Sequence, residues 1–298
     1  MPNNKSVVVG ESLAKKIAQI LKVQYISVIN RTFPDGEVQP RLKNAITAPI
    51  VILAIQKLEK ESINDYLLRF YLIVANIGPQ VKKIVAIMPY LPYARQDKTF
   101  RKGEPLSFQL IADAISDKVD EFITIDPHEH RLLVKNVFKI PTKNVSVFTA
   151  LGRQFKGEDM AIGPDKESRP FLNAFTKENN LPKLIFDKVR DTKTGKVSFK
   201  LTVKSNFKKI IANKKLVLVD DVIASGKTIL QLKDELIKNG AQSVSLAFVH
   251  NMASKDTASK LKKAGFKKII TTDTLPSPFR QITVAPSVAN FLKDYLNN

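Results

Sequence analysis

Residues 216–228 read LVLVDDVIASGKT, an apolar run of strand length that ends in two acidic residues and a turn of small residues. Such a run predicts a buried strand with Asp220 and Asp221 at its carboxyl end. The turn 224–228 can direct successive backbone N–H groups at a phosphate, which carboxylates cannot bind. The two Asp side chains then serve hydroxyl groups, a metal ion or a proton, although an Asp in such a turn can also simply cap the following helix. The stretch indicates a sugar-phosphate site.

The rest of the chain alternates strand patterns with helix patterns. The strand patterns lie at 5–9, 25–30, 50–55, 83–88, 121–125, 145–148, 159–162, 183–187, 216–219, 243–249 and 268–271. The helix patterns lie near 11–22, 62–77, 106–118, 149–156, 167–180, 228–239 and 255–264. This alternation predicts an α/β fold in which mostly parallel sheets are flanked by helices. Ligand sites in such sheets lie at the carboxyl ends of the strands.

The length of 298 residues suggests two domains. The polar, helix-breaking run 139–144 marks the expected boundary, so we predict an N-terminal α/β domain at 1–144 and a C-terminal α/β domain at 145–284. The terminal helix pattern at 285–298 is expected to pack back on the first domain. The two halves look like versions of one architecture.

Composition narrows the class of protein. Hydrophobic residues make up 44% of the chain, and no apolar run approaches the roughly 20 residues of a membrane span. The amino terminus shows no secretory signal pattern. The absence of Cys excludes disulfides, thiolate catalysis and Cys-ligated zinc or iron–sulfur centres. We therefore expect a cytoplasmic protein without a membrane partner.

The net charge of +20 raises the question of a nucleic-acid partner, because basic side chains neutralise phosphates. Most of the basic residues are Lys, however, and they occur in scattered short pairs such as Lys15-Lys16 and Lys208-Lys209. Such pairs beside apolar segments usually mark solvated faces. No basic stripe is interleaved with aromatic residues. Small polyanionic substrates are therefore favoured over a nucleic acid.

A proline-stiffened loop follows the strand pattern 83–88 and carries basic residues suited to a triphosphate. Arg95, Lys98, Arg101 and Lys102 lie in this loop, and an Arg side chain can fork onto phosphate oxygens as Lys cannot. The alternative is an ordinary solvated loop.

Two of the three His residues follow the strand pattern 121–125. His128 and His130 flank Glu129, so zinc or Mg²⁺ could be held there. No Cys or third neighbouring ligand completes a zinc site, whereas Mg²⁺ that is already held by substrate phosphates needs only one or two protein ligands. The pattern favours Mg²⁺, with ordinary polar residues at a strand end as the alternative.

Six motifs together resemble the ribose-phosphate diphosphokinase family, also called phosphoribosyl pyrophosphate synthetase. They are Phe33–Glu37, Tyr90–Asp97, Asp126–His128, Gly163–Asp165, Asp187–Arg190 and Val219–Thr228. The resemblance covers nearly the whole chain, including Thr271–Pro276 and Val284–Pro286. It implies two similar phosphoribosyltransferase-like domains, of which the first binds ATP and the second binds ribose 5-phosphate.

The resemblance implies a diphosphotransferase of nucleotide biosynthesis that transfers the diphosphoryl group of ATP to the C1 hydroxyl of ribose 5-phosphate and releases AMP. Mg²⁺ is the implied cofactor, and a homo-oligomer built from dimers that share an ATP site between subunits is the implied assembly. The implied ATP-binding residues are Phe33, Asp35, Gly36, Glu37, Arg95, Gln96, Asp97 and Lys98. The implied ribose 5-phosphate-binding residues are Arg190, Asp220, Asp221, Ala224, Ser225, Gly226, Lys227 and Thr228. Lys188 and Arg190 are implied to be catalytic, and His128 and Asp165 to hold the metal.

The chain departs from the family pattern at two places. Lys227 stands where a tight-turn glycine is usual, and residues 166–169 replace the glycines that usually follow Asp165.

Three other functions share parts of this sequence pattern. A P-loop NTPase is rejected because its motif requires Gly at the position of Asp221. A nucleobase phosphoribosyltransferase would not require the loop 33–37, and a non-catalytic regulatory relative would be expected to lack the Lys188 and Arg190 pair.

Overall fold

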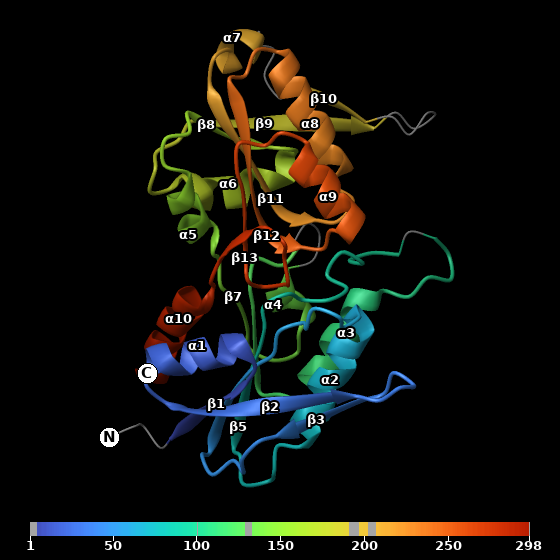
Figure 1. The fold of residues 1–298 in the computed structure, drawn as a ribbon. Helices are drawn as coiled ribbons and strands as arrows, with labels where there is room; N and C mark the ends of the chain where they lie inside the picture. Colours follow the sequence, from blue (N-terminus) through green and yellow to red (C-terminus); the bar gives the residue numbers. More distant parts are fainter. Residues whose placement is uncertain (1–4, 100, 129–132, 191–196, 202–206, 298) are drawn as a thin grey trace. The chain divides into compact units, whose positions relative to one another are not determined.

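The computed structural model describes residues 5–99, 101–128, 133–190, 197–201 and 207–297, which form two compact units (Figure 1). The first unit comprises Met1–Val145, Thr274–Pro276 and Thr283–Asn298, and the second comprises Ser146–Asp273 and Ser277–Ile282. In the described part of the chain, no helix combines the length and the apolar character that crossing a membrane requires.

The first unit contains a seven-stranded sheet in the order β3-β2-β1-β4-β5-β6-β7. Its strands are β1 (Ser6–Gly10), β2 (Gln24–Thr32), β3 (Val38–Leu42), β4 (Ile50–Ala54), β5 (Lys83–Met88), β6 (Glu121–Thr124) and β7 (Thr142–Asn144). Its helices are α1 (Ser12–Leu21), α2 (Ile63–Ala75), α3 (Ser107–Ser116), α4 (Val134–Val137) and α10 (Ala285–Asn297). All neighbouring strands are parallel except β3, which is antiparallel to β2.

The central strands of this sheet are apolar on both faces because helices cover both faces. Val7 and Val9 of β1 belong to a core cluster that includes Phe70 of α2 and Phe108 of α3. Val8 points to the opposite face and is fully buried as well. Helix α1 packs against β1 and against α10, so the end of the chain returns to the first unit (Figure 1).

The second unit repeats this plan in the order β10-β9-β8-β11-β12-β13-β14. Its strands are β8 (Met160–Gly163), β9 (Lys183–Arg190), β10 (Val197–Leu201), β11 (Lys215–Ile223), β12 (Ser243–Asn251), β13 (Ile269–Thr272) and β14 (Arg280–Ile282). Its helices are α5 (Phe148–Gly152), α6 (Arg169–Thr176), α7 (Phe207–Ile211), α8 (Lys227–Lys238) and α9 (Lys255–Lys263), with 3₁₀ turns η1 (Arg153–Phe155) and η2 (Lys166–Ser168). Among these described strands, only β10 pairs antiparallel, with β9.

Adding seven to each strand number of the first sheet reproduces the order of the second, so the two units share one topology. The predicted α/β fold with mostly parallel sheets is confirmed. In each sheet the first three strands of the chain are added one after another toward one edge. The next strand then pairs with the other side of the first strand, and the remaining strands are added toward the opposite edge. That reversal falls between β1 and β4 in the first sheet and between β8 and β11 in the second.

The predicted strand at 145–148 is wrong. The strand β7 lies just before it, in the segment expected to be a linker, and α5 begins at Phe148. Phe148 is buried and stacks on Phe171, with ring centroids 4.8 Å apart. A short apolar run satisfies a helix start or a strand equally well, so periodicity could not separate them.

Gly10 provides a test of this packing. Its φ is 144°, and a Cβ atom there would lie 2.0 Å from the carbonyl oxygen of Ala54 on β4. We expect Gly10→Ala to lower the free energy of unfolding by roughly 2–4 kcal/mol, because the backbone of two central strands would have to separate. Urea denaturation measures the change.

Gly103→Ala is the matched control, since Gly103 has φ 91° and no atom within 4 Å of an added Cβ. It should cost only the backbone strain of about 1 kcal/mol. Equal losses in the two variants would contradict the close approach of β1 and β4.

Candidate functional site

The acidic pair lies near the end of β11, between β8 and β12. Asp221 is buried, and its backbone N–H donates to Oδ1 of the half-buried Asp220 over 3.0 Å. Burial raises the pKa of Asp220 well above its usual range, and the charges of Asp221 and Asp165 add to this rise. Such a crowded set of carboxylates favours a proton, a cation or hydroxyl donors.

The turn after β11 leads directly into α8. The strand ends at Ile223, and Gly226 caps the helix with a φ of 67°, in the left-handed region. Lys227 is the exposed first residue of α8 and has a helical backbone, so its position does not require a glycine. The first N–H groups of a helix have no intrahelical partner, and a phosphate placed there can accept from them.

Asp165 follows β8, the parallel neighbour of β11. Its Oδ1 accepts from the backbone N–H of Glu167 over 3.1 Å and caps the turn η2. Ser168 is buried against Gly163, where an added Cβ would lie 1.9 Å from its Oγ. The residues that replace the usual glycines therefore form a compact 3₁₀ turn that leaves Asp165 near the acidic pair.

The backbone of Lys188 and Arg190 belongs to β9, opposite Phe199 and Val197 of β10. The side chains of Lys188 and Arg190, and the segment 191–196 after them, lie outside the described residues. Their catalytic role therefore stays a prediction.

In the first unit, residues 33–37 connect β2 to β3 as a hairpin tip. The N–H of Phe33 donates to the carbonyl of Glu37 over 2.8 Å, and Gly36 has a φ of 95°. Asp35 and Glu37 are exposed. The guanidinium of Arg31 lies over the Phe33 ring at 4.3 Å. The tip therefore presents an aromatic face and two carboxylates to whatever lies beside it.

The loop after β5 presents Arg95, Gln96 and Lys98 at the surface, while Asp97 is buried. Tyr93 shapes this loop with a φ of 63°, and its carbonyl accepts from the N–H of Gln96 over 2.8 Å. The exposed cations follow the carboxyl end of a buried strand, as expected for a phosphate-binding loop.

His128 is half-buried and follows β6, whereas Glu129 and His130 lie outside the described residues. Before it, Asp126 has a φ of 35°, and its N–H donates to Oδ1 of Asn144 over 2.8 Å. His128 belongs to the first unit and Asp165 to the second. Within the described residues, no group of three or more His, Asp and Glu side chains forms a ready metal cage.

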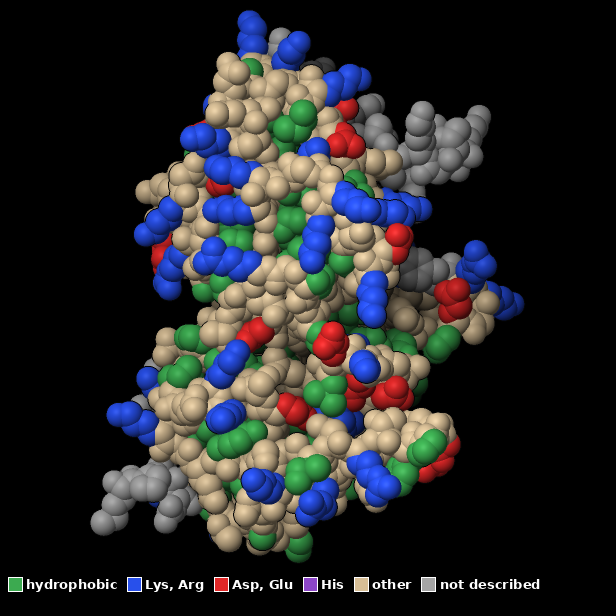
Figure 2. All heavy atoms as spheres, viewed as in Figure 1, with side chains coloured by type: hydrophobic (Ala, Val, Ile, Leu, Met, Phe, Trp, Pro, Cys, Tyr) green, Lys and Arg blue, Asp and Glu red, His purple; other side chains and the backbone are tan. Residues whose placement is uncertain are grey.

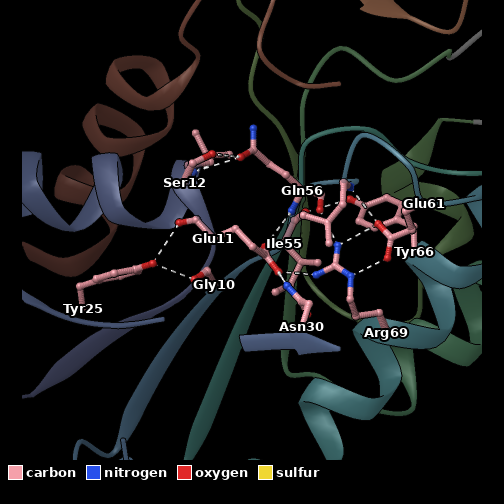
Figure 3. Close-up of polar contacts among 12 residues, drawn as sticks. Gly10, Glu11, Ser12, Tyr25, Asn30, Ile55, Gln56, Glu61, Tyr66 and Arg69 are labelled. Atoms are coloured by element: carbon pink, nitrogen blue, oxygen red, sulfur yellow. Dashed lines mark hydrogen bonds and ion pairs between the residues drawn. The ribbon is translucent and has the colours of Figure 1, made fainter. Parts of the chain in front are cut away.

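Sequence reasoning missed a buried polar cluster in the first unit, shown in Figure 3. It consists of Glu11 after β1, Gln56 after β4, Glu61 before α2 and Arg69 within α2. An acidic residue directly after a buried strand, as at Glu11, could have indicated a polar site there. Nothing in the sequence around Arg69 indicated its contacts, because its partners are distant in the sequence.

Lys and Arg side chains are scattered over the face shown in Figure 2, in places side by side, and fewer Asp and Glu side chains lie among them. That face shows no continuous basic stripe. The absence of a nucleic-acid partner stays a prediction.

Comparisons with known proteins agree with this architecture. Residues 6–118 match a model described as the N-terminal domain of ribose phosphate pyrophosphokinase, and residues 148–280 match a phosphoribosyl transferase domain. Over its whole length the chain resembles the crystal structure of phosphoribosylpyrophosphate synthetase from Mycobacterium smegmatis, with a TM-score of 0.82, 24% identity and 99% of each chain covered. The class is thus an α/β protein of two phosphoribosyltransferase-type domains.

Full-length relatives narrow this class. Ribose-phosphate pyrophosphokinase from Methanosarcina mazei is 32% identical over 96% of this chain and 93% of its own length. The enzyme of the same name from Methanopyrus kandleri is 29% identical over 96% of each chain. The chain belongs to the ribose-phosphate pyrophosphokinase family, as its motifs predicted.

Because folding raises the pKa of Asp220, the free energy of unfolding of the protein without metal, in the presence of a chelator, should depend on the charge of this side chain. A carboxyl group whose pKa is raised by folding favours the folded state when protonated, so this stability is lost as pH rises through the folded pKa. Asp220→Asn should therefore raise the free energy of unfolding by roughly 1 kcal/mol at pH 7.5. Denaturation curves at several pH values measure it.

The advantage of Asp220→Asn should shrink as the pH falls toward about 4, where the wild-type carboxyl is protonated too. A stabilisation that did not change with pH would contradict the raised pKa of Asp220 as its cause. Val222→Ala, two residues along the strand, serves as the control and should show no such pH trend.

Proposed function

We propose that this protein transfers the diphosphoryl group of ATP to the C1 hydroxyl of ribose 5-phosphate, giving 5-phosphoribosyl 1-diphosphate and AMP. One observation carries the proposal. The acidic pair Asp220 and Asp221 and the glycine-capped start of α8 lie at the strand reversal of the second sheet, in a chain of the ribose-phosphate pyrophosphokinase family.

Ribose 5-phosphate is assigned to the second unit. Asp220 and Asp221 accept hydrogen bonds from ribose hydroxyls, and the turn Ala224–Thr228 offers backbone N–H groups to the 5-phosphate. The side chains of Ser225 and Lys227 are exposed there and can add a hydroxyl and a positive charge.

ATP is assigned to the first unit. Arg95, Gln96 and Lys98 on the loop after β5 meet its phosphates, and the hairpin tip 33–37 recognises adenine through the Phe33 ring and its carboxylates. The exposure of Asp35 and Glu37 supports a dimer in which this tip reaches the site of the partner subunit.

In the reaction, the C1 oxygen forms a bond to the β-phosphorus of ATP, and the bond from that phosphorus to the oxygen of the α-phosphate breaks. The hydroxyl proton is lost, and AMP leaves with the electron pair. Lys188 and Arg190 stabilise the charge that develops on the phosphate oxygens. Charge stabilisation and alignment supply most of the rate in such transfers.

Mg²⁺ fits the available donors, because a hard cation prefers oxygen ligands and offsets both the burial and the neighbouring negative charges that raise the pKa of Asp220. Asp165 and His128 are the residues assigned to it. When bound, it neutralises charge on the phosphate oxygens.

The deciding experiment incubates the protein with ATP, Mg²⁺ and ribose 5-phosphate and separates the nucleotides. We expect AMP to form only when the sugar phosphate is present, and chelator to stop the reaction. Formation of ADP, or a requirement for a nucleobase, would overturn the proposal in favour of a kinase or a nucleobase phosphoribosyltransferase.

Lys188→Ala tests the catalytic assignment. Loss of one group that stabilises transition-state charge should lower kcat by about 10²–10³-fold and leave the KM for ATP nearly unchanged. Steady-state kinetics measure both constants.

Lys183→Ala provides a control on the same strand, where the Nζ of Lys183 donates to Oδ1 of Asn173 over 2.7 Å. It should leave kcat within about twofold, as expected for an exposed surface pair. If Lys188→Ala behaved like Lys183→Ala, Lys188 would have no catalytic role.

A further inference from the structure

The polar cluster of the first unit occupies the position that the acidic pair occupies in the second. β1 and β4 meet at the strand reversal of the first sheet, as β8 and β11 do in the second. Glu11 follows β1 directly, Gln56 lies two residues after the end of β4, and Arg69 reaches both from α2 (Figure 3). A crevice is expected at such a reversal. Here the protein's own side chains fill it.

Arg69 is 1% exposed and binds two carboxylates at once. Its Nε donates to Oε1 of Glu61 over 2.5 Å, and its NH2 donates to the carbonyl of Gln56 over 2.5 Å. Its NH1 donates to Oε1 of Glu11. Burial raises the pKa of Glu11, and the charge of Arg69 opposes that rise. Because the rigid guanidinium of Arg69 donates to three acceptors, it fixes α2 relative to the segments that carry Glu11, Gln56 and Glu61.

One arm of this cluster reaches the hairpin assigned to adenine. Nδ2 of Asn30 on β2 donates to Oε1 of Glu11 over 3.3 Å. The next residue, Arg31, lies over the ring of Phe33 at the hairpin tip. The carboxylate of Glu11 therefore binds both Arg69 and Asn30 of β2, the strand that leads into the hairpin.

The other arm reaches the loop assigned to the ATP phosphates. Oη of Tyr93 donates to Oδ1 of Asn64 over 2.7 Å, and Asn64 lies in the first turn of α2. Tyr93 precedes Arg95 by two residues and adopts a φ of 63°. The helix that carries Arg69 therefore also anchors the phosphate loop.

The hairpin strand is not held here by close packing alone. A cavity of about 300 Å³ lies between β2, β3 and α2, and its lining includes Asn30, Arg31, Glu61 and Arg69. Beside this cavity, the bonds from Asn30 to Glu11 and from Glu11 to Arg69 link the strand to the helix. The orientation of the hairpin relative to α2 therefore depends on directional polar bonds.

We propose that Arg69, through its buried bonds to Glu11 and Glu61, is a positioning residue for ATP. It holds two segments on one framework: the hairpin 33–37, which in the proposed dimer reaches the ATP site of the partner subunit, and the loop 93–98, which binds the ATP phosphates in its own subunit. The proposal rests on the proposed function, because that function assigns both segments to ATP. Arg69 itself does not touch the substrate. It acts on binding of the nucleotide, and ribose 5-phosphate does not depend on it.

Arg69→Lys tests the proposal, since Lys keeps the charge but cannot bridge three acceptors in one plane. We expect the KM for ATP, and the Kd for ATP from equilibrium binding, to rise about tenfold, because misplaced binding groups lose affinity steeply. The KM for ribose 5-phosphate should stay within twofold. Asn30→Ala keeps the bonds of Arg69 but removes the link to the hairpin, and it should show the same split with a smaller rise.

Glu158→Gln is the matched control in the second unit. Glu158 is buried, its Oε1 accepts from Oγ of Ser245 over 3.0 Å, and Lys267 lies 3.7 Å away. Loss of its charge should lower the melting temperature, as in the Arg69 variant, and leave the KM and Kd for ATP within twofold. This control separates positioning from a general loss of stability.

If the KM values for both substrates rise together, or only the melting temperature falls, Arg69 is merely structural and the proposal is overturned. If Arg69→Lys does not fold, Asn30→Ala decides by the same criterion. If the wild-type protein binds ATP but forms no AMP with ribose 5-phosphate, the proposed function fails, and the Kd for ATP still tests the positioning role.

Discussion

The location of the candidate site residues depends on two parallel strand pairs. These are β1 with β4 in the first unit and β8 with β11 in the second. At each pair the chain changes the direction in which it builds the sheet, so the following loops separate to opposite faces and leave room at the carboxyl edge. The second unit keeps polar groups ready in that room, with Asp220 and Asp221 beside Asp165. The first unit closes it with Arg69 and two carboxylates.

The polar groups at the carboxyl ends of the central strands differ between the two units in how their charges are compensated. Arg69 brings a cation to Glu11 and Glu61, so this buried cluster combines opposite charges and satisfies its donors internally. Asp220 has neighbouring carboxylates instead, and burial together with the charges of Asp221 and Asp165 raises its pKa. Carboxyl groups buried close together in this way destabilise the folded protein until a cation or a substrate hydroxyl group binds them.

Sequence patterns predicted the parts of the fold that depend on local periodicity and on turn chemistry. The apolar run before Asp220 became β11, and the turn after it became the start of α8. The edge strands β3 and β10 were missed. β3 contains Pro40, which weakens a strand pattern, whereas Val197, Phe199 and Leu201 of β10 alternate with polar residues and gave a signal that was overlooked. The role of Arg69 was out of reach, since its bond to Glu11 spans 58 positions and only the folded sheet brings the two together.

Lys227 also affects the stability of the folded protein. It places a positive charge at the positively polarised start of α8, an unfavourable arrangement that a bound dianion reverses. A ligand that binds only the folded state stabilises it in proportion to the logarithm of its concentration. Under the proposed function, the supply of phosphorylated sugar therefore controls how rarely this chain opens to proteases. Cellular abundance of the protein is then coupled to the concentration of its own substrate.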